Sequence, residues 1–150
     1  MNLYSFLVLI HIFSAIIGMG PGFILTIIPK TANTMTELRH AYALRHRLHI
    51  LVMIGGSLLL VTGLLMGAIH PYLFKAGWYL TSLTLFLIAL AMGPLVLSPK
   101  SRPIKQLLAE SQGEDIPETY TKLSKALFKV EYIENTIFLI IIGLMILKPV

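Results

Sequence analysis

Two histidines and two carboxylates are spaced so that they could bind a divalent metal ion. His46 and His49 are three residues apart. Glu131 and Glu134 have the same spacing, which places each pair on one face of a helix. If the two faces meet, two imidazoles and two carboxylates make a ligand set for zinc, manganese or iron. The alternative is that the carboxylates form ion pairs and the histidines stay solvated. The candidate basic partners are Arg45, Arg47 and Lys129.

A single histidine in the first apolar stretch could ligate haem b or a related porphyrin. His11 shares one predicted helix face with small residues, namely Ser14, Ala15, Gly18 and Gly22. Gly63, in the second apolar stretch, is expected at nearly the same depth and would leave space for a macrocycle with His11 as axial ligand. Met66 is the candidate for a second ligand. The alternative is a buried histidine that is hydrogen-bonded to a Ser or a carbonyl on the next helix.

Four apolar stretches must position these side chains. The last charge-free run, Asn135–Leu147, has 13 residues. As a helix it spans about 20 Å, against a hydrocarbon core of roughly 30 Å. The fourth crossing therefore has to begin near Lys129, which draws Glu131 and Glu134 to the edge of the membrane or into it. The approximate crossings are residues 3–29, 50–69, 76–99 and 129–147.

Composition indicates an all-α polytopic membrane protein. The 150 residues are 56% hydrophobic and 13% charged, whereas a soluble domain carries about 25% charge. There is no cysteine, which excludes disulfides, thiolate metal sites and thiol catalysis. We expect one integral membrane domain over residues 1–150, a four-transmembrane-helix bundle whose second and fourth helices extend into the cytoplasm.

The basic residues predict the orientation. Ten of the twelve Lys and Arg residues lie in the two connections around 30–47 and 100–129. The positive-inside rule places these connections in the cytoplasm and both termini outside the cell membrane. The net charge of +5 then needs no nucleic-acid partner. The expected partner is the lipid bilayer, with a homo-oligomer or a larger membrane complex left open.

Local signals predict where the helices begin and bend. Thr34-Met35-Thr36-Glu37 has the pattern of a capping box, so the second helix should begin well before its apolar part. A turn at Gln112–Asp115 should precede a helix that runs from Glu118 into the fourth crossing, with Asp115 or a neighbour as its cap. Pro21 and Pro94 should kink the first and third helices.

Several short motifs resemble a bacterial superfamily of four-helix membrane proteins. They are Leu9-Ile10-His11-Ile12, Arg47-Leu48, Thr62-Gly63-Leu64, Trp78 and the closing Glu134…Lys148-Pro149. The superfamily includes the HemJ-type protoporphyrinogen oxidases and the CopD copper-resistance domain, and the chain is most similar to an uncharacterised branch, a domain of unknown function. The resemblance implies a haem-binding role for His11. Ser82 stands where the HemJ-type proteins have a lysine.

Three classes of function are compatible with these residues. The first is a haem- or porphyrin-linked redox protein, and the second is a divalent-metal or small-solute transport component. The third is a structural accessory subunit without catalysis. The chain contains no nucleophile elbow and no phosphate-binding glycine loop. Its sequence therefore does not identify a reaction, and enzymatic activity is left open.

Overall fold

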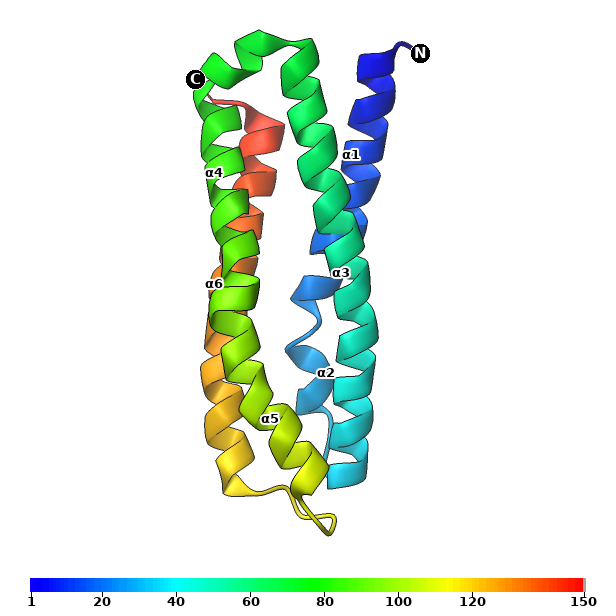
Figure 1. Cartoon of the computed structure of the whole chain (residues 1–150), viewed down its shortest axis with the longest axis vertical. Coiled ribbons are helices and arrows are strands. Elements are labelled where there is room, and N and C mark those ends of the chain that lie inside the picture. Colours follow the sequence, from blue (N-terminus) through cyan, green and yellow to red (C-terminus); the bar gives the residue numbers. More distant parts are fainter. Residues whose placement is uncertain (150) are drawn as a thin grey trace.

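The protein is an all-α bundle of four long helices, as a computed structural model of residues 1–149 shows (Figure 1). Each of the four is long and apolar enough to cross a membrane: Leu3–Lys30, Met35–Ile69, Gly77–Glu110 and Glu118–Leu147. Both termini lie at one end of the bundle, and the α2–α3 and α5–α6 connections lie at the other. The predicted fold class, a four-helix membrane bundle, is confirmed.

The first long helix is interrupted rather than kinked. It consists of α1 (Leu3–Met19), a 3₁₀ turn η1 (Pro21–Phe23) and the short α2 (Ile27–Lys30). Pro21 has no N–H to continue the α-helical ladder, and the chain re-forms α-helix only at Ile27. The prediction of a simple kink at Pro21 was therefore too modest, because the α-helix is interrupted from Gly20 to Thr26.

The second and fourth long helices extend beyond the apolar band as predicted. They are α3 (Met35–Ile69) and α6 (Glu118–Leu147). Thr34 caps α3, and its hydroxyl accepts from the Glu37 N–H at 3.2 Å. The Glu37 carboxylate in turn accepts a hydrogen bond from the Asn33 N–H at 2.6 Å, which is the second bond of the capping box. The expected Asp115 cap of α6 was wrong, because Pro117 occupies the N-cap position without a side-chain bond.

The third long helix continues past the predicted end at residue 99. It comes after η2 (Pro71–Lys75) and runs through α4 (Gly77–Met92), a π-helical turn η3 (Gly93–Leu97) and α5 (Ser98–Glu110). The π turn surrounds Pro94, where a wider turn accommodates the missing N–H. Pro99 and Pro103 did not end the helix, because α5 buries Ile104 and Leu108 at the end of the bundle that holds the α5–α6 connection.

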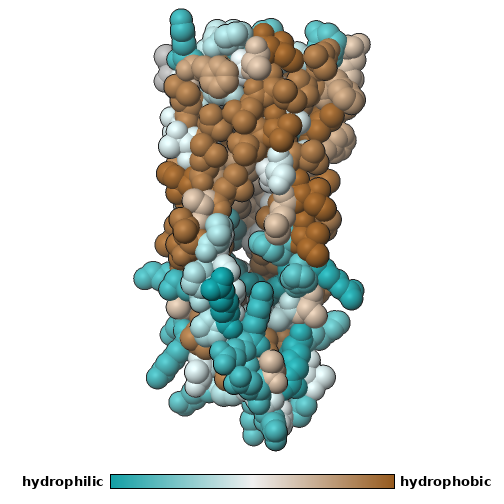
Figure 2. All heavy atoms as spheres, in the orientation of Figure 1, coloured by the Kyte–Doolittle hydropathy of each residue, from teal (hydrophilic) through white to brown (hydrophobic). Residues whose placement is uncertain are grey.

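Two helix pairs make up the bundle. α1 packs along α3, and α4 packs along α6. Close approach of α1 and α3 depends on glycine, because a Cβ at Gly18 would lie 2.7 Å from the backbone of Gly55 and Gly56. Gly18 therefore lies at the contact between the two helices. Figure 2 shows an apolar band toward the end that carries the termini and a hydrophilic surface at the opposite end.

The base of the bundle has its own apolar core and its own polar ties. The core is a cluster of seven buried residues: Met35, Leu38, Ile104, Leu108, Tyr120, Leu127 and Phe128. Next to it, Glu114 accepts from the Thr36 N–H at 3.2 Å and from the Thr36 hydroxyl at 2.7 Å. Arg39 donates to the carbonyls of Leu108 and Ser111, at the end of α5. These contacts tie the α5–α6 connection to the start of α3.

Candidate functional site

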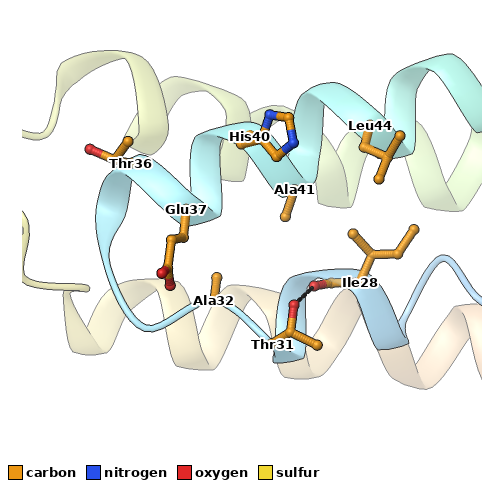
Figure 3. A pocket seen from close by; sticks show the side chains of 8 residues that line it. All are labelled: Ile28, Thr31, Ala32, Thr36, Glu37, His40, Ala41 and Leu44. Atoms are coloured by element: carbon orange, nitrogen blue, oxygen red, sulfur yellow. Dashed lines mark hydrogen bonds between the residues drawn. The ribbon is translucent and has the colours of Figure 1, made fainter.

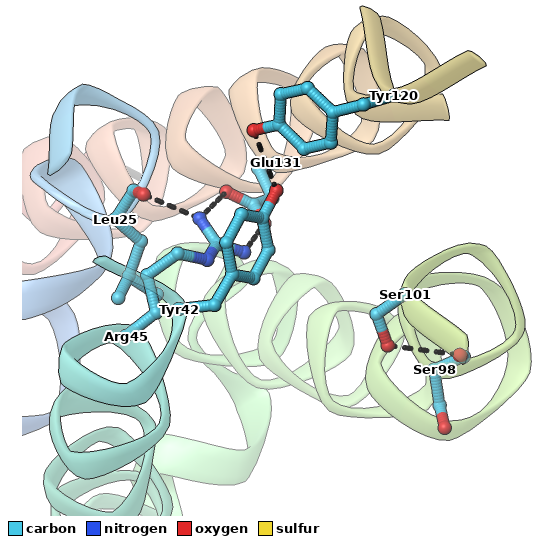
Figure 4. Close-up of polar contacts among 7 residues, drawn as sticks. All are labelled: Leu25, Tyr42, Arg45, Ser98, Ser101, Tyr120 and Glu131. Carbon is cyan, nitrogen blue, oxygen red and sulfur yellow. Dashed lines mark hydrogen bonds and ion pairs between the residues drawn. The ribbon is translucent and has the colours of Figure 1, made fainter. Parts of the chain in front are cut away.

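A bidentate ion pair joins α3 to α6 at the lower edge of the apolar band (Figure 4). Arg45 donates to Glu131 through two nitrogens, Nη2 to Oε1 at 2.5 Å and Nη1 to Oε2 at 3.3 Å. The side chains are only 12% and 10% exposed. Such a fork-to-fork geometry gives the strongest kind of charge-assisted hydrogen bond. Glu131 therefore forms an ion pair, as the alternative interpretation of the sequence predicted, and its partner is Arg45.

The same guanidinium also holds the interrupted first helix. Arg45 Nη1 donates to the carbonyl of Leu25, between η1 and α2. In a continuous helix this carbonyl would accept from the N–H of residue 29, but Pro29 has none. A backbone acceptor left open at this depth needs another donor, and Arg45 supplies it. The ion pair thus connects three of the four long helices.

Aromatic rings surround the ion pair. The guanidinium carbon lies 5.1 Å from the centre of the Tyr42 ring and 5.7 Å from that of Phe128, within the range of cation–π contacts. The Tyr42 and Tyr120 hydroxyls are 3.1 Å apart, and their rings meet edge to face. Neither tyrosine was predicted from the sequence as part of a site. Tyr42 is three residues before Arg45, a spacing that could have identified it as a neighbour on the same helix face.

Glu134 lies one turn further along α6 and is not part of the ion pair. It is half-buried, and among residues 1–149 it has neither a hydrogen bond nor an ion pair. It lies 13 residues from Leu147, about 20 Å from that end of α6 by helix rise. The next residue, Asn135, faces the interrupted helix, since its Oδ1 would be 3.6 Å from a Cβ at Gly22. A carboxylate within the span is therefore without a partner in the described residues.

The four predicted metal ligands do not come together. His46 and His49 are exposed on α3, whereas Glu131 is buried against Arg45. Within the described part of the chain, no group of three or more His, Asp or Glu side chains could hold a metal ion. The physical reason is that Arg45 occupies the helix face that the two histidines would need to share with Glu131.

His11 is hydrogen-bonded to α3, the next long helix, as expected from the alternative to haem ligation. Its Nδ1 lies 2.7 Å from the Thr62 hydroxyl. The same hydroxyl lies 2.7 Å from the Leu58 carbonyl oxygen, so Thr62 links His11 to the backbone of α3. A Cβ at Gly63 would lie 3.4 Å from His11 Cε1. The space that Gly63 leaves is thus filled by the imidazole itself.

The remaining predicted cofactor residues take part in packing. Gly18 lies against Gly55, and Met66 is buried in a cluster with Leu7, Leu73 and Tyr79. Ser82 is almost fully buried, and its hydroxyl is without a hydrogen-bond partner in the described residues.

A hollow of about 500 Å³ lies between the α2–α3 connection and the start of α3 (Figure 3). Its polar groups already have partners. Thr31 donates to the Ile28 carbonyl at 2.8 Å, and Glu37 accepts from the Asn33 N–H. His40 on the same wall is exposed. These contacts belong to the capping of α3 and make no separate site.

Comparison with known protein families finds a match over nearly the whole chain. The sequence profile of a family described as "Predicted integral membrane protein (DUF2269)" matches residues 5–149. No curated protein and no solved structure matches the chain.

Proposed function

Because the chain belongs to the DUF2269 family of integral membrane proteins, we propose a function within the bilayer: it is a proton-linked transport component. Glu134 is the group that takes up and releases the proton. The observation that supports this most is the position of Glu134, half-buried within a membrane-spanning helix and without a partner among residues 1–149.

An ionised carboxylate is costly at this depth, and residues of this kind are rare unless they serve a function. Glu131 avoids the cost through Arg45. Glu134 has no such partner, so its charge is best relieved by a proton or a small cation. A carboxylate that changes between a protonated and an ionised form is the simplest unit of proton movement.

The interrupted first helix supports the same function. Irregular backbone at membrane depth is tolerated where it is buried in protein or lines a cavity, and transporters build their ion sites from discontinuous helices. Here the break from Gly20 to Thr26 lies opposite Asn135 of α6, and Arg45, which is paired with Glu131, also bonds to Leu25 within the break. Arg45 fixes the break, and Glu134, the residue before Asn135, is left free to bind an ion.

Two other functions from the sequence have less support. The metal ligands are apart, so divalent-metal transport through His46 and His49 has no site to start from. Haem ligation by His11 would have to use Nε2, since Nδ1 is bonded to Thr62, and the packing of the imidazole against Gly63 already accounts for the space that the glycine leaves. A structural accessory role makes no use of an unpaired carboxylate, whereas proton transport does.

We test the proposal with purified protein in vesicles that contain a pH-sensitive dye. An inside-negative potassium diffusion potential should drive acidification faster in these vesicles than in empty ones. Glu134→Gln should reduce the rate to that of empty vesicles. The matched control is Glu118→Gln, an exposed carboxylate in the first turn of the same helix, which should leave the rate unchanged.

Two results would contradict the proposal. One is a wild-type rate equal to that of empty vesicles, and the other is a Glu134→Gln rate equal to wild type. Glutamine keeps the shape of the side chain, so an unchanged melting temperature for this variant shows that lost transport is not lost folding.

We also infer the orientation from charge. The end of the bundle that holds the α2–α3 and α5–α6 connections carries ten of the twelve Lys and Arg residues, and it is the hydrophilic end in Figure 2. Short loops rich in Lys and Arg stay in the cytoplasm. This end then faces the cytoplasm, and both termini are outside.

A further inference from the structure

We propose that a groove along α6 binds an anionic phospholipid, with the phosphate held by Lys30, Lys125 and Lys129. This groove, the lysine groove, has a volume of about 730 Å³. Phe128, Tyr132 and Ile133 form its apolar wall. The inference is independent of proton transport, because it concerns the outer surface of α6 and not the face that carries Glu134.

The three ammonium groups come from two segments that are far apart in the sequence. Lys30 ends α2, whereas Lys125 and Lys129 are one turn apart on α6. Lys30 is held in place, since its Nζ donates to the Tyr132 hydroxyl and lies 5.1 Å from the centre of that ring. The same Nζ lies 5.9 Å from the centre of the Phe128 ring. The aromatic wall thus directs one cation toward the other two.

These charges have no protein counter-ion. The described residues contain a single ion pair, Arg45–Glu131, and no Asp or Glu lines the groove. All three lysines are exposed. Like charges gathered without a carboxylate are complementary to an anion, and an ammonium group donates strong, charge-assisted hydrogen bonds to phosphate oxygens.

The position of the groove favours a lipid over a free phosphate. Lys129 is 18 residues from Leu147 and Lys125 is 22 residues from it. These spacings correspond to about 27 and 33 Å of helix, close to the boundary of a hydrocarbon core of roughly 30 Å. Ile133 and Thr136 continue the groove into the apolar band. A headgroup at the lysines can therefore extend its acyl chains along the groove.

The experiment measures how added lipid raises the melting temperature of detergent-solubilised protein. Phosphatidylglycerol should stabilise the wild type with a saturable dose dependence, and phosphatidylcholine should not. Replacing Lys30, Lys125 and Lys129 by Gln should weaken the apparent affinity for phosphatidylglycerol. A basic residue at the surface is worth about fivefold, so the three together should amount to a loss on the order of 100-fold.

Two matched variants separate the groove from general charge and from folding. Replacing Lys100, Lys105 and Lys122 by Gln removes the same charge from the same end of the bundle outside the groove, and it should leave the affinity nearly unchanged. Changing the three groove lysines to Arg keeps the charge and should keep binding.

Three outcomes would overturn the inference. Equal losses in the two glutamine variants would mean diffuse attraction. Equal stabilisation by phosphatidylcholine would mean an apolar groove without headgroup selection. Equal stabilisation by free glycerol phosphate would mean a site for a soluble phosphate.

Discussion

Replacing Gly18 by Ala should destabilise the bundle through the contact between α1 and α3. The added methyl carbon would lie 2.7 Å from the Gly55 carbonyl carbon and from the Gly56 nitrogen. Both of these atoms belong to backbone inside a long helix, so neither can rotate away as the end of a side chain could. The two helices must separate locally to admit the methyl group.

The size of the effect can be worked out from that overlap. Carbon atoms normally pack at roughly 3.5–4.0 Å, so α1 and α3 have to move apart by about 1 Å at this point. Overpacking of a tightly packed site typically costs about 1–3 kcal/mol. For a chain of this length, that loss corresponds to a fall in melting temperature of about 2–12 °C.

The assay is thermal unfolding in mild detergent, with Gly143→Ala as the control. Gly143 lies in the second half of α6, and a Cβ there would meet no atom within 4 Å, so the same added methyl should cause no clash. If Gly18→Ala melts at the same temperature as Gly143→Ala, α1 and α3 do not approach each other as closely as the structure shows.

Further predictions use the same preparation. His11→Ala should lower the melting temperature, because it removes a hydrogen bond worth about 1 kcal/mol and empties the notch at Gly63; a Soret band in wild-type protein that this variant loses would instead make His11 a haem ligand. The hydrogen bonds from Thr36 hold the pKa of the Glu114 carboxyl below its ordinary 4.5. Their stabilisation is therefore complete above pH 4.5 and is lost as the pH falls through the lower folded pKa, so the melting temperature of Glu114→Gln should be less sensitive to acid than that of wild type. In a chain without cysteine, Gln112→Cys should react with an impermeant maleimide only after cells are permeabilised, and Ala76→Cys should react in intact cells; the reverse pattern would overturn the orientation.

The long elements could be predicted because their signals are local or additive. Hydropathy summed over about twenty residues identifies a membrane span, and the Thr34–Glu37 capping box marks the start of α3 nearly to the residue. The length argument for the fourth crossing was equally direct, and α6 does run from Glu118 through Glu131 and Glu134 without a break.

The prolines mark the limit of local signals. Pro21 and Pro94 remove the same N–H, yet one accompanies a break of the helix and the other a single π turn. Further prolines follow in both helices, Pro29 in the first and Pro99 and Pro103 in the third, so the number of lost donors does not explain the difference. The chain after Pro94 buries Ile104 and remains helical. That outcome depends on the base of the bundle, which only the tertiary structure supplies.

The sequence identified residues of the candidate site but not which of them contact one another. Glu131 had a metal and an ionic interpretation, and the choice depends on which side chain of α3 faces it. Arg45 faces it because the same guanidinium must also satisfy the Leu25 carbonyl that Pro29 leaves open. A hydrogen bond between residues 20 positions apart, made by a side chain to a broken backbone, has no signature in helix periodicity.

The interrupted first helix and the ion pair share the guanidinium of Arg45. Pro29 leaves the Leu25 carbonyl open, and Arg45 donates both to this carbonyl and to Glu131. The next carboxylate along α6, Glu134, is without a partner in the described chain. Replacing Pro29 would return a donor to the Leu25 carbonyl and loosen the hold on Arg45. Pro29 therefore influences the Arg45–Glu131 ion pair from another helix, through the carbonyl that it leaves for Arg45 to bind.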